Sequence, residues 1–145
     1  MRLEKGTCKM IVADCMSYSP FVAQATDSVG KVCRLLREAD VRHLPVVDAG
    51  MLVGIVSDRD LQGPLSGASG ANAPLWSEQV LERPISTLMS SDVISVDTEA
   101  DVDEVIDLMI EHKIGAVPVV EPHTLKVIGI VSYIDVLRAA RAALA

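Results

Sequence analysis

Residues 44–60 read LPVVDAGMLVGIVSDRD, and residues 117–135 read VPVVEPHTLKVIGIVSYID. Both stretches hold two short apolar runs separated by a turn. Both end in Gly-Ile-Val-Ser, with an Asp three positions after the Ser. Short apolar runs around a turn rich in Gly, Pro and Asp predict a β-hairpin. The chain therefore contains the same hairpin pattern twice.

The repeat extends well beyond the hairpin. A shift of 73 residues aligns residues 11–47 with residues 84–120 without a gap. In each copy a short segment containing Met-Ser leads into a first strand at residues 21–23 or 94–96, and apolar residues then follow at the spacing of one helix face. Each hairpin is followed by another helix. The order is therefore β-α-β-β-α in each copy, an α/β (α+β) fold with a parallel first strand pair.

The repeat also sets the expected domain boundaries. We predict a first domain at residues 8–61, a linker at residues 62–83 and a second domain at residues 84–145. Gly63-Pro64 predicts that the last helix of the first copy ends within about one turn. The linker should contain a short helix, with Trp76 as its anchor.

Charge and cysteine content exclude several classes of function. The formal net charge is −7 and the pI is about 4.8, whereas a protein that binds nucleic acid or an anionic membrane normally carries a basic face. The three cysteines include no C-x-x-C pair, so neither a disulfide framework nor a zinc site is indicated. No apolar run approaches the length of a membrane span. We expect a cytoplasmic protein that needs no metal or cofactor.

The sequence does not favour an enzyme. His43, His112 and His123 lie in different parts of the repeats, and none has a cysteine or serine at a motif spacing. Nucleophilic catalysis needs such a nucleophile and base together. We therefore expect a protein that is not an enzyme.

The repeated motifs, Met-Ser, Pro-Val-Val and Gly-Ile-Val-Ser-x-x-Asp in this order, resemble a tandem pair of CBS (cystathionine-β-synthase-type) domains, or Bateman module. The resemblance covers residues 8–61 and 84–138. It implies two repeats packed around a pseudo-two-fold axis, with clefts between them that take adenosine ligands such as AMP, ADP, ATP, NAD or S-adenosylmethionine. It also implies a homodimer that signals to a separate effector protein.

The Ser-x-x-Asp motifs are the expected ligand sites. Asp60 and Asp135 each offer two acceptor oxygens, which match the two hydroxyl donors of a ribose. Ser57 and Ser132 lie at helix starts, where free N–H groups favour phosphate. The same pattern is also an ordinary helix capping box, which needs no ligand.

The copies differ in the residues expected to bind phosphate. Copy one has Arg42 and His43 before its Pro-Val-Val motif, and copy two has Gly115-Ala116 there. Arg binds phosphate bidentately and His can donate to it. Arg59 is a further candidate cation, although a surface ion pair with a neighbouring Asp is an equal alternative. Arg42 could equally be a solvated cation at a helix end, and His43 a polar side chain at a strand edge.

Base recognition is expected near the first strands. The resemblance assigns it to backbone groups and apolar side chains, around Pro20 in copy one and Val93 in copy two. Tyr133 could stack on a purine or cover the sheet edge. The leading hypothesis is a regulatory module that binds an adenine nucleotide. The alternative is a structural or dimerisation module with empty clefts.

Overall fold

The structure is a computed structural model that describes residues 10–66 and 78–144. Contacts divide these residues into two compact units. Unit 1 holds residues 10–20 and 94–144, and unit 2 holds residues 21–66 and 78–93. In chain order the elements are η2 (Val12–Asp14), β1 (Ser17–Tyr18), β2 (Ala23–Gln24), α1 (Val29–Ala39), β3 (His43–Asp48), β4 (Met51–Ser57), α2 (Asp58–Ser66), α3 (Glu78–Glu82), η3 (Ile85–Thr87), β5 (Val96–Asp97), α4 (Val102–His112), β6 (Ala116–Val120), β7 (Val127–Ser132) and α5 (Tyr133–Leu144).

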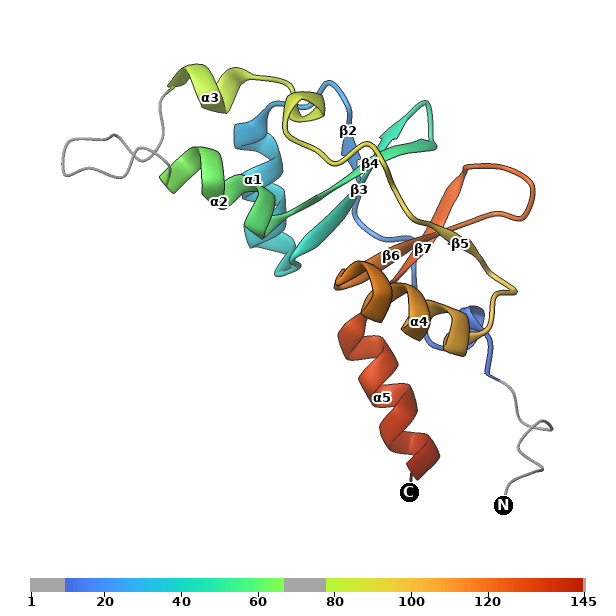
Figure 1. The fold of residues 1–145 in the computed structure, drawn as a ribbon. Coiled ribbons are helices and arrows are strands. Elements are labelled where there is room, and N and C mark those ends of the chain that lie inside the picture. The colour runs from blue at the N-terminus through green and yellow to red at the C-terminus, as the bar shows by residue number, and fades with distance from the viewer. Residues whose placement is uncertain (1–9, 67–77, 145) are drawn as a thin grey trace. The chain divides into compact units, whose positions relative to one another are not determined.

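Unit 2 is a three-stranded sheet with helices at one end. Strand β3 lies between β2, which is parallel to it, and β4, which is antiparallel. Helices α1, α2 and α3 gather at the end of the β3–β4 hairpin opposite its turn (Figure 1). Ser28 caps α1 by accepting a hydrogen bond from the Lys31 N–H at 3.1 Å. The apolar face of α1, the strands and single residues of α2 and η3 form one buried core: Ala23, Val29, Val32, Leu36, Leu44, Val46, Val56, Leu61 and Ile85.

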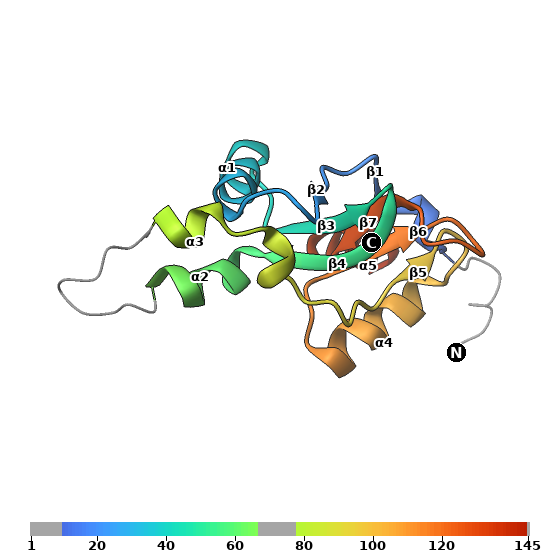
Figure 2. The same cartoon turned by 90° about the horizontal axis from the view of Figure 1, so that it is seen from above.

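Unit 1 repeats this plan and adds a strand. Its sheet has the order β1-β7-β6-β5, with β5 parallel to β6 and the other pairs antiparallel. Helix α4 packs on β6 and on α5. The added strand β1 comes from the N-terminal part of the chain and lies beside β7 (Figure 2). The buried core of unit 1 contains Val12, Met16, Val96, Val105, Met109, Val117, Val119, Val131 and Val136.

The predicted β-α-β-β-α order and strand directions are confirmed in both copies. The first strands are shorter and later than the predicted segments at residues 21–23 and 94–96, because they begin where the backbone meets its parallel partner. Ala23 pairs with Val46, and Val96 pairs with Val119. Apolar composition indicated where each first strand lies, but its exact bounds depend on its pairing with β3 or β6.

The prediction that Gly63-Pro64 ends the helix was wrong. Helix α2 continues to Ser66. The fixed φ of proline is itself helical, so the chain can continue after the loss of one backbone hydrogen bond. The helix α3 confirms the short linker helix expected within residues 75–83. Trp76, its expected anchor, lies outside the described residues, as does Cys8.

The N-terminal segment of each repeat packs in the unit of the other repeat. Residues 10–18, the first lead segment, belong to unit 1, where Ser17 and Tyr18 pair with Ile130 and Gly129 of β7. Residues 84–91, the second lead segment, belong to unit 2, where Ser90 and Ile55 of β4 exchange two backbone hydrogen bonds of 2.9 and 3.0 Å. The predicted boundaries at 8–61, 62–83 and 84–145 follow the sequence repeat and stay a prediction.

A glycine lies under each lead segment. A Cβ on Gly129 would lie 2.6 Å from the Met16 sulfur and 2.9 Å from the Ser17 carbonyl oxygen. A Cβ on Gly54 would overlap the Met89 sulfur and lie 2.9 Å from the carbonyl oxygen of Ser90. A methionine side chain can move, but a backbone carbonyl cannot move cheaply. Glycine is therefore required at both positions for the backbones to approach so closely.

The described residues contain no helix that is long and apolar enough to cross a membrane.

We expect Gly129→Ala to destabilise the protein. The added methyl group must displace the first lead segment from β7, and overpacking of this kind costs about 1–3 kcal/mol. Urea denaturation should show a lower midpoint with a measurable loss in the free energy of unfolding. Gly54→Ala should behave in the same way.

Gly30→Ala is the matched control. Gly30 is in α1, and its Cβ would lie 3.4 Å from the nearest atom, the Leu81 carbonyl oxygen. Alanine is favoured over glycine in a helix by about 1 kcal/mol, so this variant should be neutral or more stable. If Gly129→Ala were as stable as Gly30→Ala, the close approach of the lead segment would be refuted.

Candidate functional site

The first Ser-x-x-Asp motif lies where β4 ends and α2 begins. The Ser57 N–H donates to Asp60 Oδ2 at 2.9 Å, and the Asp60 N–H donates to Ser57 Oγ at 3.1 Å. These reciprocal bonds form a capping box, which satisfies two backbone donors at the helix start. Both side chains are half-buried. The structure therefore shows the capping role that the sequence left open.

The capping box leaves acceptor capacity on Asp60. Its second oxygen, Oδ1, accepts no hydrogen bond from any residue that the structure describes. A carboxylate oxygen also has two lone pairs, so Oδ2 can accept a second donor. Capping and ribose binding are therefore compatible in one side chain, and the two interpretations of the motif do not exclude each other.

Basic residues lie next to this first motif. His43 lies opposite Ser57 in the β3–β4 pairing, and the Arg42 carbonyl oxygen accepts a hydrogen bond from the Asp58 N–H at 2.9 Å. Arg42 and Arg59 are exposed. The expected phosphate-binding residues of copy one are thus brought together with Ser57 at one end of the hairpin, where a ligand could reach them.

Burial and the neighbouring charges both change the pKa of His43. Burial lowers the pKa of His43 below its ordinary value of 6.5. The carboxylates of Asp58 and Asp60 oppose that shift, whereas Arg42 and Arg59 add to it. His43 is therefore mainly neutral at pH 7, and it can donate one hydrogen bond without adding a positive charge.

The second motif has the same cap. The Ser132 N–H donates to Asp135 Oδ2 at 2.9 Å, and the Asp135 N–H donates to Ser132 Oγ at 3.3 Å. The Ser132 hydroxyl also donates to Asp135 Oδ2 at 3.1 Å. Asp135 Oδ1 lies 3.8 Å from a guanidinium nitrogen of Arg138. More of the acceptor capacity of Asp135 is thus engaged than that of Asp60.

The surroundings of the second motif lack the basic side chains. Ala116 lies opposite Ser132 and is buried. The Gly115 carbonyl oxygen accepts the Tyr133 N–H at 2.9 Å, which reproduces the backbone contact of copy one without a side chain. Tyr133 and Ile134 are exposed at the start of α5. The backbone of the two sites is therefore alike, and their side chains are different.

Cys15 is a neighbour of the second motif that the sequence did not reveal. Burial raises the pKa of the Cys15 thiol, and the carboxylates of Asp135 and Asp14 raise it further. Cys15 is half-buried in the first lead segment and packs against the core of unit 1. It lies far from Asp135 in sequence, and the exchanged lead segment brings them together. No local pattern could have indicated this proximity.

The residues expected to contact the base fall at the edges of the units. Pro20 belongs to unit 1, together with Ser132 and Asp135, and Val93 belongs to unit 2, together with Ser57 and Asp60. Both side chains are half-buried. Each predicted base contact therefore shares a unit with the motif of the other repeat. Their role in base recognition stays a prediction.

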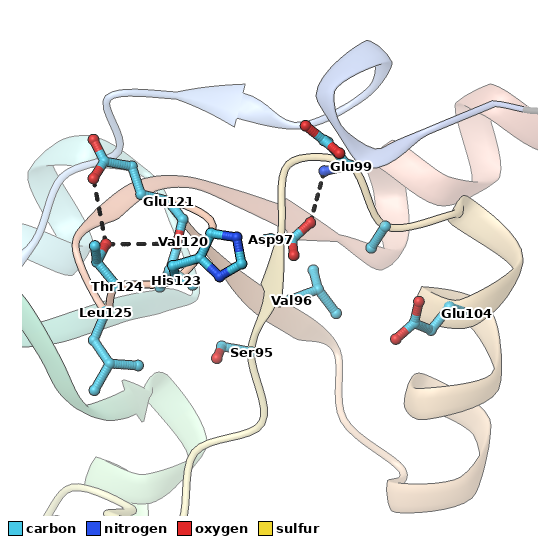
Figure 3. Close-up of a pocket in the computed structure, with 11 residues that line it drawn as sticks. Ser95, Val96, Asp97, Glu99, Glu104, Val120, Glu121, His123, Thr124 and Leu125 are labelled. Atoms are coloured by element: carbon cyan, nitrogen blue, oxygen red, sulfur yellow. Dashed lines mark hydrogen bonds between the residues drawn. The ribbon is translucent and has the colours of Figure 1, made fainter.

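A separate open pocket of about 540 Å³ lies in unit 1. It is formed by β5, the start of α4 and the β6–β7 turn, and its lining includes the carboxylates of Asp97, Glu99, Glu104 and Glu121 (Figure 3). Ala116 pairs with Ser132 at one end of the hairpin, whereas the pocket includes Val120 at the other end of β6. Its acidic lining would repel phosphate. It is therefore unsuited to a nucleotide phosphate.

The acidic lining does not form a metal centre. Among the residues that the structure describes, no three His, Cys, Asp or Glu side chains are grouped closely enough to hold a metal ion.

Comparison with protein families identifies the repeat. The family model of the CBS domain matches residues 12–66 and again residues 85–142. The chain belongs to the CBS-domain family. The two consecutive matches make it a tandem pair, as the repeated motifs predicted. CBS domains are generally regulatory and not catalytic.

Two curated relatives illustrate the contexts of this module. The chain is 30% identical over 129 residues to L-aspartate semialdehyde sulfurtransferase from Methanocaldococcus jannaschii, a match that covers 88% of this chain and 23% of that protein. It is 29% identical to the SNF1-related protein kinase regulatory subunit gamma-1-like of Arabidopsis thaliana, covering 91% of this chain and 31% of that protein. The chain thus spans less than a third of either relative.

Solved structures of similar proteins confirm the fold. CBSX2, crystallised in complex with AMP, has a TM-score of 0.79 and 29% identity, with 93% of this chain and 99% of that chain covered. The CBS domain pair of protein MJ0100, in complex with 5′-methylthioadenosine and S-adenosyl-L-methionine, has a TM-score of 0.77 and 28% identity, with 94% and 99% covered. The chain therefore has the fold of a CBS domain pair.

We expect the protein to lose stability in mild acid through His43. Because the pKa of folded His43 lies below 6.5, the unfolded chain binds its proton more readily between that folded pKa and about pH 6.5. The stabilisation is complete above about pH 6.5 and is lost as the pH falls through the folded pKa. Urea denaturation between about pH 5 and pH 7.5 should show a steeper loss for the wild type than for His43→Gln. An equal loss of stability with falling pH in the wild type and in His43→Gln would contradict this role of His43.

Proposed function

We propose that this CBS pair is a regulatory module that binds an adenosine-type nucleotide at its Ser-x-x-Asp motifs. The observation that carries the proposal is the capping box of Ser57 and Asp60, which leaves Asp60 Oδ1 able to accept a ribose hydroxyl beside Arg42. The AMP complex of the similar CBSX2 supports the choice of ligand class. S-adenosylmethionine and NAD belong to the same class.

We further propose that the bound state is passed to a partner protein. A ligand that binds one arrangement of the two units more tightly than another shifts the population towards it, by no more than the difference in affinity. The similar Arabidopsis protein is named as a regulatory subunit of a protein kinase, which supports a regulatory role of this kind.

We expect Asp60→Asn to weaken AMP binding. Asn keeps one acceptor oxygen, which can still hold the Ser57 N–H, but it loses the charge and the second oxygen that would receive the ribose. A hydrogen bond to a charged group contributes about 1.5–3 kcal/mol, which is roughly a tenfold to hundredfold change in affinity. Isothermal titration calorimetry with AMP measures the loss.

Asp27→Asn is the matched control for this variant. Asp27 Oδ2 accepts the Gln24 N–H at 2.8 Å in the same unit, so the substitution changes a similar backbone contact away from the motif. AMP affinity should be unchanged. Absence of heat and of any rise in melting temperature with AMP, ADP, ATP, NAD and S-adenosylmethionine would refute the proposed function and favour a structural module with empty sites.

We also propose that the protein forms a homodimer through α5. Ile134, Leu137 and Leu144 follow one another at helical spacing on this helix and are 40%, 58% and 86% exposed. A stripe of large exposed apolar side chains is typical of a protein interface. A second copy of the chain would cover it with an identical stripe.

We expect Leu137→Glu to shift the protein from dimer to monomer. The substitution places a carboxylate in the apolar stripe, where pairing with a second copy would bury it without a partner. Size-exclusion chromatography with light scattering gives the mass. Leu125→Glu, at an exposed leucine of the β6–β7 turn, should leave the dimer intact. A monomeric wild type would refute the dimer.

A further inference from the structure

We propose that the two motifs select different ligands by the charge of the 5′ group. The site at Ser57 and Asp60 takes an adenosine ligand with a 5′-phosphate. The site at Ser132 and Asp135 takes an adenosine ligand whose 5′ substituent is uncharged or cationic. This inference rests on the proposed function and assigns a chemical class to each site.

The first site provides cations for a phosphate. The Arg42 carbonyl oxygen accepts the Asp58 N–H, and Arg59 is in the first turn of α2. The positive charges of both arginines lower the pKa of His43. Both arginines are exposed, and neither forms an ion pair among the residues that the structure describes. Two such guanidinium groups beside a helix start can bind a phosphate through charge-assisted hydrogen bonds.

The second site has fewer cations than the first, where Arg42 and Arg59 accompany the carboxylates of Asp58 and Asp60. The positions of Arg42 and His43 are occupied by Gly115 and Ala116, which offer no side-chain donor. Asp135 is part of the motif itself, and both Asp14 and Asp135 raise the pKa of the half-buried Cys15 thiol. A phosphate placed here would meet like charge, whereas a sulfonium or ammonium group would meet opposite charge.

The side chains at the start of α5 favour an apolar substituent. Tyr133 and Ile134 replace Asp58 and Arg59, and both are exposed. A thioether or similar uncharged 5′ group can pack against Tyr133 with no cost of desolvating a phosphate. A guanidinium nitrogen of Arg138 already lies 3.8 Å from Asp135, and this side chain is mostly exposed. The motif thus keeps its ribose acceptor and loses its phosphate ligands.

The experiment measures the binding of AMP and of 5′-methylthioadenosine by calorimetry to the wild type, Asp60→Asn and Asp135→Asn. The two ligands share the nucleoside and differ at the 5′ position. We expect Asp60→Asn to lose about tenfold or more in AMP affinity and to keep 5′-methylthioadenosine binding. We expect Asp135→Asn to show the reverse pattern.

A third variant isolates the charge of the 5′ group. Arg42→Gln leaves both carboxylates and both capping boxes in place. It should weaken AMP about tenfold, as expected for one charged hydrogen bond, and leave the 5′-methylthioadenosine affinity at the other site unchanged. An equal loss of both ligands would overturn the division by charge.

The outcomes separate the two proposals. If both ligands bind the wild type but each Asp variant weakens both of them equally, the charge selection is wrong and the proposed function stands. If neither ligand binds the wild type, while circular dichroism shows a folded protein, the proposed function fails and the inference fails with it. A wild type that binds two molecules of AMP with equal affinity would also overturn the division of the sites.

Discussion

The contact between a lead segment and a side-chain-free strand position underlies the whole architecture. At Gly129 and at Gly54 a neighbouring carbonyl oxygen lies only 2.9 Å from where a Cβ would be, so the two backbones approach too closely for a side chain to fit between them. Each contact joins the start of one sequence repeat to the hairpin of the other. The methionine before each carbonyl fills the space above the glycine. The two repeats are thereby joined by packing as well as by the chain.

The two motifs show how a shared scaffold can carry different chemistry. Both capping boxes use the same backbone bonds, and in both the residue before β3 or β6 accepts the same backbone N–H. The caps are alike because both motifs keep the same Ser and Asp, and the carbonyl contact joins main-chain atoms only, so it survives the change from Arg42 to Gly115. Charge does not depend on main-chain geometry. It follows the side chains of residues 42 and 59 in unit 2, and in unit 1 that of residue 14, which arrives with the lead segment.

Sequence reasoning reached the parts of the structure that local pattern determines. Apolar spacing located α1 and α4, the Gly-Ile-Val-Ser runs located the hairpins, and Ser-x-x-Asp marked both helix starts. It missed what depends on distant partners. The pairing of Ser17 with Ile130 and the approach of Cys15 to Asp135 join positions that no sequence window contains. It also wrongly predicted that Gly63-Pro64 would end the helix. A proline removes one backbone hydrogen bond, and helix α2 continues to Ser66 despite that loss.

The way the units divide the chain sets the order in which they can fold during synthesis. Unit 2 is one continuous segment, whereas unit 1 is built from residues 10–20 and from residues after Val93. A growing chain emerges from its N-terminus, and domains generally fold as units. Unit 2 can therefore close as soon as Val93 has emerged. Until β7 (Val127–Ser132) has been made, Val12 and Met16 lack the strand against which they pack. These two side chains, which are buried in the folded protein, are therefore exposed on the nascent chain. This apolar segment is made before unit 2 but is covered only after unit 2 has been made.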